Sequence, residues 1–153
     1  MEQLSEELIR IWLRMSGVLK NNRIISSMTF NEIFVCNILY HQKKTNSALL
    51  TATDVGLKMK LLKSQMNKVL NSLEKQAIIR RLRSNEDKRK IYLELVDENI
   101  SIYLDEHQRV LNMLEQLILD LGEEKIQQVI SLMNEVTNSM ELIMEKGNDS
   151  DKL

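Results

Sequence analysis

The chain has 153 residues, of which 43% are hydrophobic and 28% charged, and its formal net charge is −1. These values are ordinary for a soluble globular domain, and no apolar run approaches the ~20 residues of a membrane span. A single cysteine excludes an internal disulfide, and the acidic start of the chain lacks the basic-then-apolar pattern of a secretory signal. We therefore expect a cytoplasmic protein, mostly helical because proline is absent and glycine is rare.

The first third of the chain predicts two helices. Apolar residues recur at steps of three and four from Leu4 onward, which predicts a helix from residue 5 to about residue 25. Thr29 and Glu32 form a capping box for a second helix that ends near residue 41. Cys36 lies in its middle, where a small buried residue is favoured over a peroxide-sensing thiol. Residues 49–50 predict a short edge strand.

The stretch from Thr51 to Leu95 predicts two short helices followed by two strands. Thr51 and Asp54 repeat the capping pattern at the start of the third helix. The fourth helix is predicted over residues 63–76, with residue 64 as an alternative start. Strands over 78–82 and 91–95 then pair around a charged turn. Helix, turn, helix and a two-stranded ribbon are the order of a winged helix-turn-helix, so the predicted fold class is mostly α with a small β wing.

Positive charge is concentrated in the same stretch. Between Lys58 and Lys90 there are eleven basic and three acidic residues, so this segment carries +8 while the rest of the chain carries −9. Such a concentration indicates a surface for a polyanion, although a solvated charged face is the alternative.

Polar residues on the fourth helix and at the wing tip are the candidate DNA contacts. Glutamine and asparagine can pair with adenine, lysine can reach guanine or phosphate, and arginine suits a narrow minor groove. The candidates on the helix are Lys63, Ser64, Gln65, Asn67, Lys68 and Asn71. Those at the wing are Arg83, Ser84, Asp87, Lys88, Arg89 and Lys90.

Three local features carry a family resemblance. A helix-ending run of residues 73–79 is followed by the acid-x-arginine pair of Asp87 and Arg89, and then by alternating apolar residues in the second strand. This pattern resembles the MarR (multiple antibiotic resistance regulator) family of winged helix-turn-helix transcription factors. Ala77 and Lys60 stand where glycine is common in that family.

The resemblance implies specific roles and partners. Arg89 is expected to enter the minor groove and Asp87 to position the wing or that arginine. The terminal helices are expected to interlock in a homodimer on a double-stranded, inverted-repeat DNA operator. Small aromatic or anionic effectors bind many family members between the dimerisation helices and the DNA-binding lobe. Such a pocket here is predicted from Trp12, Met15, Phe34, Tyr103 and His107.

The last third of the chain predicts two long helices. Asp97 is expected to cap the first, Gly122 to separate the two, and Gly147 to end the second before a disordered tail at 148–153. Their long apolar stripes require another copy of the chain. We therefore expect a helical dimerisation region, 1–28 with 97–147, and a winged helix-turn-helix DNA-binding lobe, 29–96.

No catalytic or metal-binding pattern accompanies these features. There is no nucleophile elbow and no phosphate-binding glycine loop, so we expect neither an enzyme nor a cofactor. His107 and His41 are the only histidines, which argues against a metal site. The leading prediction is a homodimeric regulator, expected to be a repressor and released by a small effector. The alternatives are a winged-helix protein-interaction module without sequence-specific DNA binding, and a metal- or thiol-sensing family member.

Overall fold

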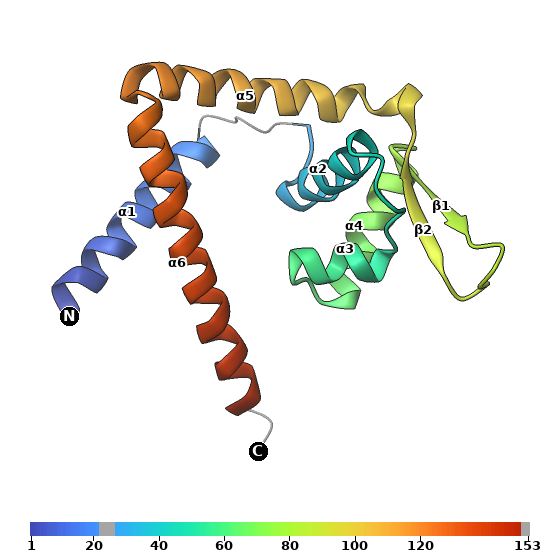
Figure 1. Cartoon of the computed structure of the whole chain (residues 1–153), viewed down its shortest axis with the longest axis horizontal. Coiled ribbons are helices and arrows are strands. Elements are labelled where there is room, and N and C mark those ends of the chain that lie inside the picture. The colour runs from blue at the N-terminus through green and yellow to red at the C-terminus, as the bar shows by residue number, and fades with distance from the viewer. Residues whose placement is uncertain (22–26, 151–153) are drawn as a thin grey trace. The chain divides into compact units, whose positions relative to one another are not determined.

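The computed structural model describes residues 1–21 and 27–150, and the elements within them confirm the predicted fold class (Figure 1). The chain divides into two compact units, Met1–Val110 and Leu111–Leu153. In chain order, the elements are α1 Glu2–Asn21, α2 Phe30–Lys44, α3 Ala52–Met59, α4 Lys63–Lys75, β1 Ile79–Arg83, β2 Ile91–Leu95, the 3-10 helix η1 Asp97–Asn99, α5 Ser101–Leu121 and α6 Glu123–Ser150. Among the helices of these residues, none is long and apolar enough to cross a membrane.

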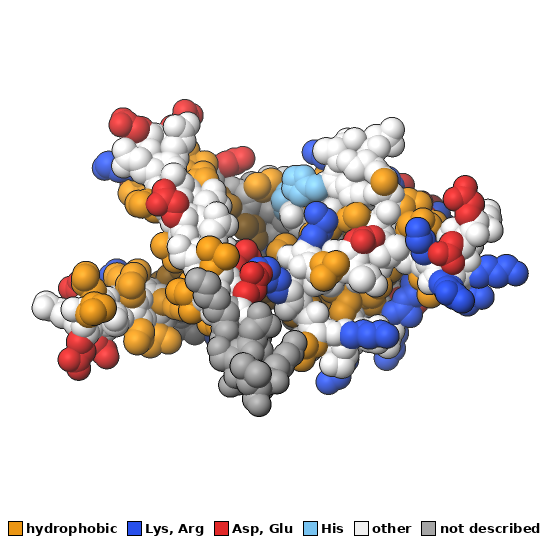
Figure 2. Space-filling view, turned by 60° about the horizontal axis from the view of Figure 1, so that its bottom comes forward, with side chains coloured by type: hydrophobic (Ala, Val, Ile, Leu, Met, Phe, Trp, Pro, Cys, Tyr) orange, Lys and Arg blue, Asp and Glu red, His pale blue; other side chains and the backbone are white. Residues whose placement is uncertain are grey.

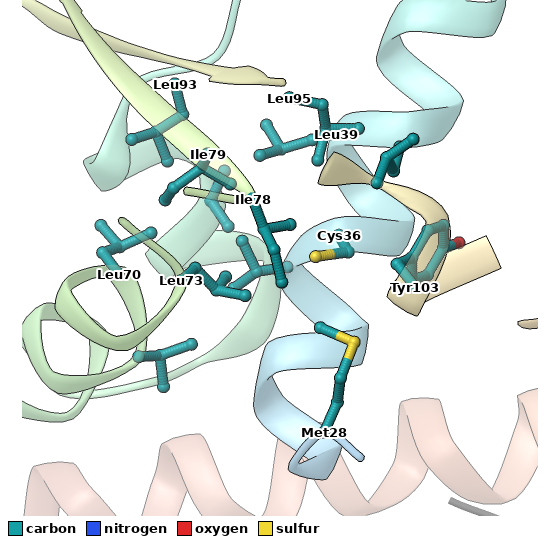
Figure 3. Close-up of a cluster of buried hydrophobic side chains, with 14 of the residues drawn as sticks. Met28, Cys36, Leu39, Leu70, Leu73, Ile78, Ile79, Leu93, Leu95 and Tyr103 are labelled. Atoms are coloured by element: carbon teal, nitrogen blue, oxygen red, sulfur yellow. The ribbon is translucent and has the colours of Figure 1, made fainter. Parts of the chain in front are cut away.

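The segment from α2 to β2, here called the winged lobe, is built around one apolar core. α2 packs against α3, α4 and β2, while α4 also packs against β1. The strands pair antiparallel with Ile79 opposite Leu95 and Arg83 opposite Ile91. Figure 3 shows side chains from α2, α4, both strands and α5 converging on this core. The inward residues of α4 are Met66, Val69, Leu70 and Leu73, a helical spacing that leaves the opposite face to solvent.

Side chains cap α2 and α3 as the sequence predicts, and α4 has a related contact that the sequence did not predict. The Glu32 N–H donates to Thr29 Oγ1 at 3.3 Å, and the Thr29 N–H donates to the Glu32 carboxylate at 2.7 Å. Thr51 and Asp54 repeat this exchange at 3.2 and 2.7 Å. At α4 the Leu62 N–H donates to Gln65 Oε1 at 3.1 Å, so the helix begins at Lys63 rather than at residue 64.

Both positions where glycine is common in MarR-type chains have left-handed backbone. Lys60 has φ 51° and Ala77 has φ 55°. A Cβ in this region clashes with the following carbonyl, at a cost of roughly 1–2 kcal/mol. The Ala77 turn is held by the Asn99 side chain, whose amide donates to the Ala77 carbonyl at 3.1 Å.

The structure corrects several predicted boundaries. Residues 49–50 form no strand; instead Thr51 makes an isolated bridge with Tyr92, and the Leu93 N–H donates to the Leu50 carbonyl at 2.9 Å. β1 spans Ile79–Arg83, one residue later than predicted. The predicted end of the first helix near residue 25 lies outside the described residues.

The two long C-terminal helices also differ from prediction at their ends. Asp97 lies in η1 and pairs with Lys43 instead of capping α5, which begins at Ser101. Gly122, with φ 85°, separates α5 from α6 as predicted. α6 continues to Ser150, so residues 148–150 are helical, and residues 151–153 of the predicted tail lie outside the described residues. Gly147 does not end the helix, because a glycine in a helix interior costs only about 1 kcal/mol.

α1 and α6 each leave their apolar stripes exposed within the unit to which they belong. On α6, Ile130, Met133 and Val136 are more than half exposed, and on α1 the same holds for Leu4 and Leu8. Apolar stripes of this length are not stable in water without a partner surface.

The left-handed residues generate a stability prediction. Lys60→Gly and Ala77→Gly should each raise the free energy of unfolding by about 1 kcal/mol, because glycine adopts this backbone without the Cβ clash. Urea unfolding of each variant against the parent chain measures the change. Lys68→Gly, in the right-handed interior of α4, is the matched control and should be destabilising. Equal destabilisation by all three substitutions would contradict the assigned turn geometry.

Candidate nucleic-acid interface

The outer face of α4 presents a row of polar side chains in its first three turns. Lys63, Ser64, Gln65, Asn67, Lys68 and Asn71 are all exposed, as the helical spacing predicts. Figure 2 shows Lys and Arg side chains gathered at the wing end of the winged lobe, in the region that follows α4 along the chain. A helix with such a row can lie in the major groove, where amide and ammonium groups reach base edges.

The carboxamide of Gln65 can cap the start of α4 and contact a base edge at the same time. Its oxygen accepts the Leu62 N–H at the start of α4, while its NH₂ group is exposed at the surface. A carboxamide oxygen has two lone pairs, so the cap leaves one acceptor position and both donors for a base edge. The cap therefore also fixes the direction in which this side chain leaves the helix.

Asn71 has a contact that the sequence reading missed. Arg81 of β1 donates to Asn71 Oδ1 at 2.8 Å and forms an ion pair with Glu74 at 3.2 Å. One guanidinium therefore joins the wing to two positions of α4, one turn apart. The alternation of β1 could have indicated this, since Arg81 lies on the same strand face as buried Ile79. Asn71 is thus engaged within the protein through its side-chain oxygen, although the residue is exposed.

The wing tip is shaped by side chains that bond to its own backbone. Ser84 Oγ accepts the N–H groups of Glu86 and Asp87, each at 3.2 Å. Asp87 Oδ1 accepts the Arg89 N–H at 3.0 Å, and its carbonyl accepts the Lys90 N–H at 2.9 Å. Ser84 and Asp87 therefore hold the turn.

The basic side chains of the wing surround this turn. Arg83, Lys88, Arg89 and Lys90 are all exposed. The contact of Asp87 is with the backbone of Arg89, so it orders the chain around the arginine and leaves the guanidinium able to reach outward. The arrangement provides four cations on a ribbon that projects from the lobe, which suits the phosphate backbone and a minor groove.

Glu32 links the capping box of α2 to the C-terminal turns of α4. It is only 5% exposed, yet its carboxylate accepts hydrogen bonds from Ser72 Oγ at 2.6 Å and Gln76 Nε2 at 3.1 Å besides those of Thr29. Burial, the largest single effect, raises the pKa of Glu32, but the bonds from Ser72, Thr29 and Gln76 together lower it below the ordinary value. The ionised carboxylate thus fixes where α4 crosses α2.

The residues predicted to line an effector pocket are only partly brought together. The Tyr103 and His107 rings stack at 5.4 Å, and Tyr40 lies against both at 5.7 and 6.1 Å. Burial, followed by the nearby charges of His41 and Lys44, lowers the pKa of His107. Phe34 packs edge-on against Phe30 instead. Trp12 and Met15 are exposed on α1, at 57% and 48%.

In the described part of the chain, the structure supports neither a thiol-sensing site nor a metal-sensing site. Cys36 is fully buried in the lobe core (Figure 3), and burial, with a smaller effect of the Glu32 charge, raises its pKa to about 12. A thiol in this setting is neutral and a poor nucleophile. Within residues 1–21 and 27–150, no three His, Cys, Asp or Glu side chains lie together as metal ligands would.

Comparison with known proteins agrees with this geometry. The family model described as transcriptional regulator SarA/Rot matches residues 21–111, more than half of the 153 residues. No curated protein sequence matches the chain at a significant level.

Solved structures share the fold. The PcaV transcriptional regulator from Streptomyces coelicolor, in complex with its natural ligand, has a TM-score of 0.69 at 20% identity over 87% of this chain and 91% of that chain. Streptococcus pneumoniae FabT in complex with DNA has a TM-score of 0.68 at 20% identity over 92% and 96%. S. aureus MepR in a DNA-binding conformation has a TM-score of 0.69 at 18% identity over 90% and 98%. These are MarR-family regulators, so the predicted resemblance is confirmed in fold.

The Glu32 network generates a pH prediction. Because the folded-state pKa of Glu32 lies below its unfolded value of about 4.3, its contribution to stability is fully present above that pH and is lost as pH falls through the folded-state pKa. Glu32→Gln should lower the free energy of unfolding at neutral pH by about 1–3 kcal/mol and weaken the loss of stability on acidification. Chemical unfolding at a series of pH values measures both effects.

The matched control for Glu32 is Glu115→Gln, an exposed carboxylate on α5. It should leave stability and its acid dependence close to those of the parent chain. If Glu32→Gln kept the full acid dependence, the carboxylate would not be the group that links α2 to α4.

Proposed function

Because the chain belongs to the SarA/Rot family of transcriptional regulators, we propose that it is a repressor that binds an inverted-repeat DNA operator as a homodimer. The observation that carries this proposal is the exposed polar row of α4 beside a basic wing. α4 would enter the major groove through its first turns, and the wing would follow the backbone into the flanking minor groove. The solved complex of FabT with DNA, which has the same fold, supports this placement.

The proposed homodimer would form through the terminal helices. The region 1–28 with 97–147 would provide the dimer surface, while the winged lobe, 29–96, would contact DNA. The exposed apolar stripes of α1 and α6 support this division, because a second copy would bury them. A two-fold dimer presents two α4 helices, which fits half-sites about one helical turn apart.

Release by a small effector is the regulatory part of the proposal. PcaV, which shares the fold, was solved with its natural ligand, and this supports a comparable site here. The Tyr40, Tyr103 and His107 rings at the junction of α2 and α5 are one place for an aromatic effector. A regulator that acts on DNA in this way would work in the cytoplasm and needs no catalytic step.

The alternative is a winged-helix module that binds proteins and no longer reads DNA. The segment from Lys58 to Lys90, with its net charge of +8, argues against it. Titration of mixed-sequence duplex DNA at several salt concentrations separates the two functions. Tight binding that weakens steeply with salt supports the regulator, since cations on the protein displace counterions from DNA. Weak binding that is insensitive to salt would favour the protein-interaction module.

The wing generates the first functional prediction. Arg89→Ala should weaken binding to most duplexes and should reduce the slope of log K against log salt by about one unit, as loss of one phosphate-neutralising cation does. It should also reduce any preference for A·T-rich flanks. Fluorescence anisotropy with labelled duplexes at several salt concentrations measures all three. Unchanged affinity and slope would remove the wing tip from the interface.

Gln65 and Asn71 generate a prediction about sequence reading. Gln65→Ala should change the ranking of operator variants by about 1–3 kcal/mol at one base pair, because a base-edge contact is lost. Asn71→Ala should weaken binding to all variants evenly, since its oxygen is held by Arg81 and the loss loosens the wing instead. Binding to a panel of single-base operator variants distinguishes these effects. The opposite assignment of the two patterns would contradict the proposed reading face.

The apolar stripe of α6 generates a prediction about assembly. Val136→Asp should shift the protein toward monomer, because burying an unpaired carboxylate in the dimer surface costs several kcal/mol. Operator affinity should fall with it, while helix content should stay the same. Sedimentation velocity and circular dichroism measure these properties. Asn134→Asp, a neighbouring exposed position, is the matched control and should remain dimeric. A dimeric Val136→Asp variant would exclude this stripe from the interface.

A further inference from the structure

Leu62 is a large apolar side chain that is exposed at the start of the proposed reading helix. It is 70% exposed and immediately precedes α4. The nearby Leu61 and Met66, by contrast, belong to the lobe core or pack against it. A single exposed leucine is common on protein surfaces and carries little information by itself. The position of this one is informative, because residues 63–65 beside it are all polar, exposed and part of the candidate DNA-contacting row.

The local fold gives no reason for a leucine at this position. Residue 62 is the N-cap of α4, with φ −64° and ψ 147°. Ser, Thr, Asp and Asn are preferred at N-caps because their side-chain oxygen accepts an N–H of the first turn, and a leucine side chain has no acceptor. Thr29 and Thr51 supply that oxygen at α2 and α3. Leu62 therefore contributes neither a side-chain cap nor core packing, which points to a role outside the fold.

The backbone around Leu62 is held from both sides. Its N–H donates to Gln65 Oε1 at 3.1 Å, and its carbonyl accepts the Met66 N–H at 2.9 Å. Met66 is only 3% exposed, so this end of α4 is fixed to the core. On the preceding side, the Leu61 N–H donates to the Gly56 carbonyl at 3.2 Å. The Leu62 side chain is thus presented from an ordered backbone, and binding requires little further ordering of the chain.

We propose that Leu62 contacts the 5-methyl group of a thymine in the operator and thereby contributes to sequence reading. The inference rests on the repressor function proposed above, in which the first turns of α4 enter the major groove. The thymine methyl is the apolar group that base edges present in that groove, and apolar side chains recognise it by contact. Burying it against the leucine removes apolar surface of both from water.

Leu62 and Gln65 together favour the same kind of base pair. Gln65 can bond to the N6 and N7 atoms of adenine, while Leu62 contacts the methyl group of thymine. The hydrogen bond from the Leu62 N–H to Gln65 Oε1 places both residues at the same end of α4. Each half-site should therefore contain an A·T pair that faces the start of α4.

The test replaces thymine with deoxyuridine, which differs from it only by the missing methyl group. The full-length parent protein first selects duplexes from a random-sequence library, and each thymine of the tightest binder is then replaced in turn. At one thymine in each half-site, the replacement should weaken binding by the parent chain about threefold to fivefold, as expected for the loss of one buried methyl group. The same replacement should leave binding by Leu62→Ser unchanged. Fluorescence anisotropy measures both affinities.

The stability of Leu62→Ser separates a DNA contact from a structural role. Serine at this position completes an S-x-x-Q capping box with Gln65, so the urea midpoint should rise while the affinity for the thymine duplex falls. Leu57→Ser is the matched control, because Leu57 is 72% exposed and lies on α3. This control should keep the full discrimination between thymine and deoxyuridine.

Equal binding of thymine and deoxyuridine at every position would overturn the contact and leave the proposed repressor intact. Loss of the discrimination in Leu57→Ser but not in Leu62→Ser would also overturn it. A fall in both the urea midpoint and the affinity of Leu62→Ser, with the discrimination kept, would make Leu62 a structural residue. If the parent protein selected no duplex from the library, the proposed repressor would fail and this contact with it.

Discussion

The position of α4, the proposed DNA-reading helix, depends on one buried carboxylate. Removing an ionised group from water costs several kcal/mol unless hydrogen bonds replace its hydration. Glu32 receives such bonds from Thr29, Ser72 and Gln76, all of them neutral donors. It also occupies the first turn of α2, where the helix dipole favours negative charge. The same group that caps one helix therefore determines where the C-terminal turns of α4 lie.

A cation of the wing also holds α4 in place. Arg81 connects β1 to Asn71 and Glu74, so the strand that leads to the wing is tied to the C-terminal half of α4. Ser84 and Asp87 then order the tip without occupying its basic side chains. Helix and wing are therefore fixed to each other by neutral and ionic contacts within the lobe, while the charges that DNA would neutralise remain exposed.

Local patterns in the sequence predicted the local structure well. The capping boxes at Thr29 and Thr51 and the α4 stripe appear as expected, because each depends on residues within one or two turns. The contacts that the sequence did not predict join residues that lie far apart along the chain. Asp97 forms an ion pair with Lys43 instead of capping α5, and Arg81 donates a hydrogen bond to Asn71. Spacing along the chain carries no information about such pairs, since packing brings them together.

The distribution of charge along the chain would direct DNA toward the proposed reading face. The segment from Lys58 to Lys90 carries +8 and the remainder −9, so the phosphate backbone is attracted to one region of the chain and repelled by the rest. Lys60 belongs to that segment although its left-handed backbone would suit glycine better. A glycine there would relieve strain but would remove one cation beside the start of α4. The strain is thus consistent with a surface in which electrostatic attraction orients the protein before its side chains reach the bases.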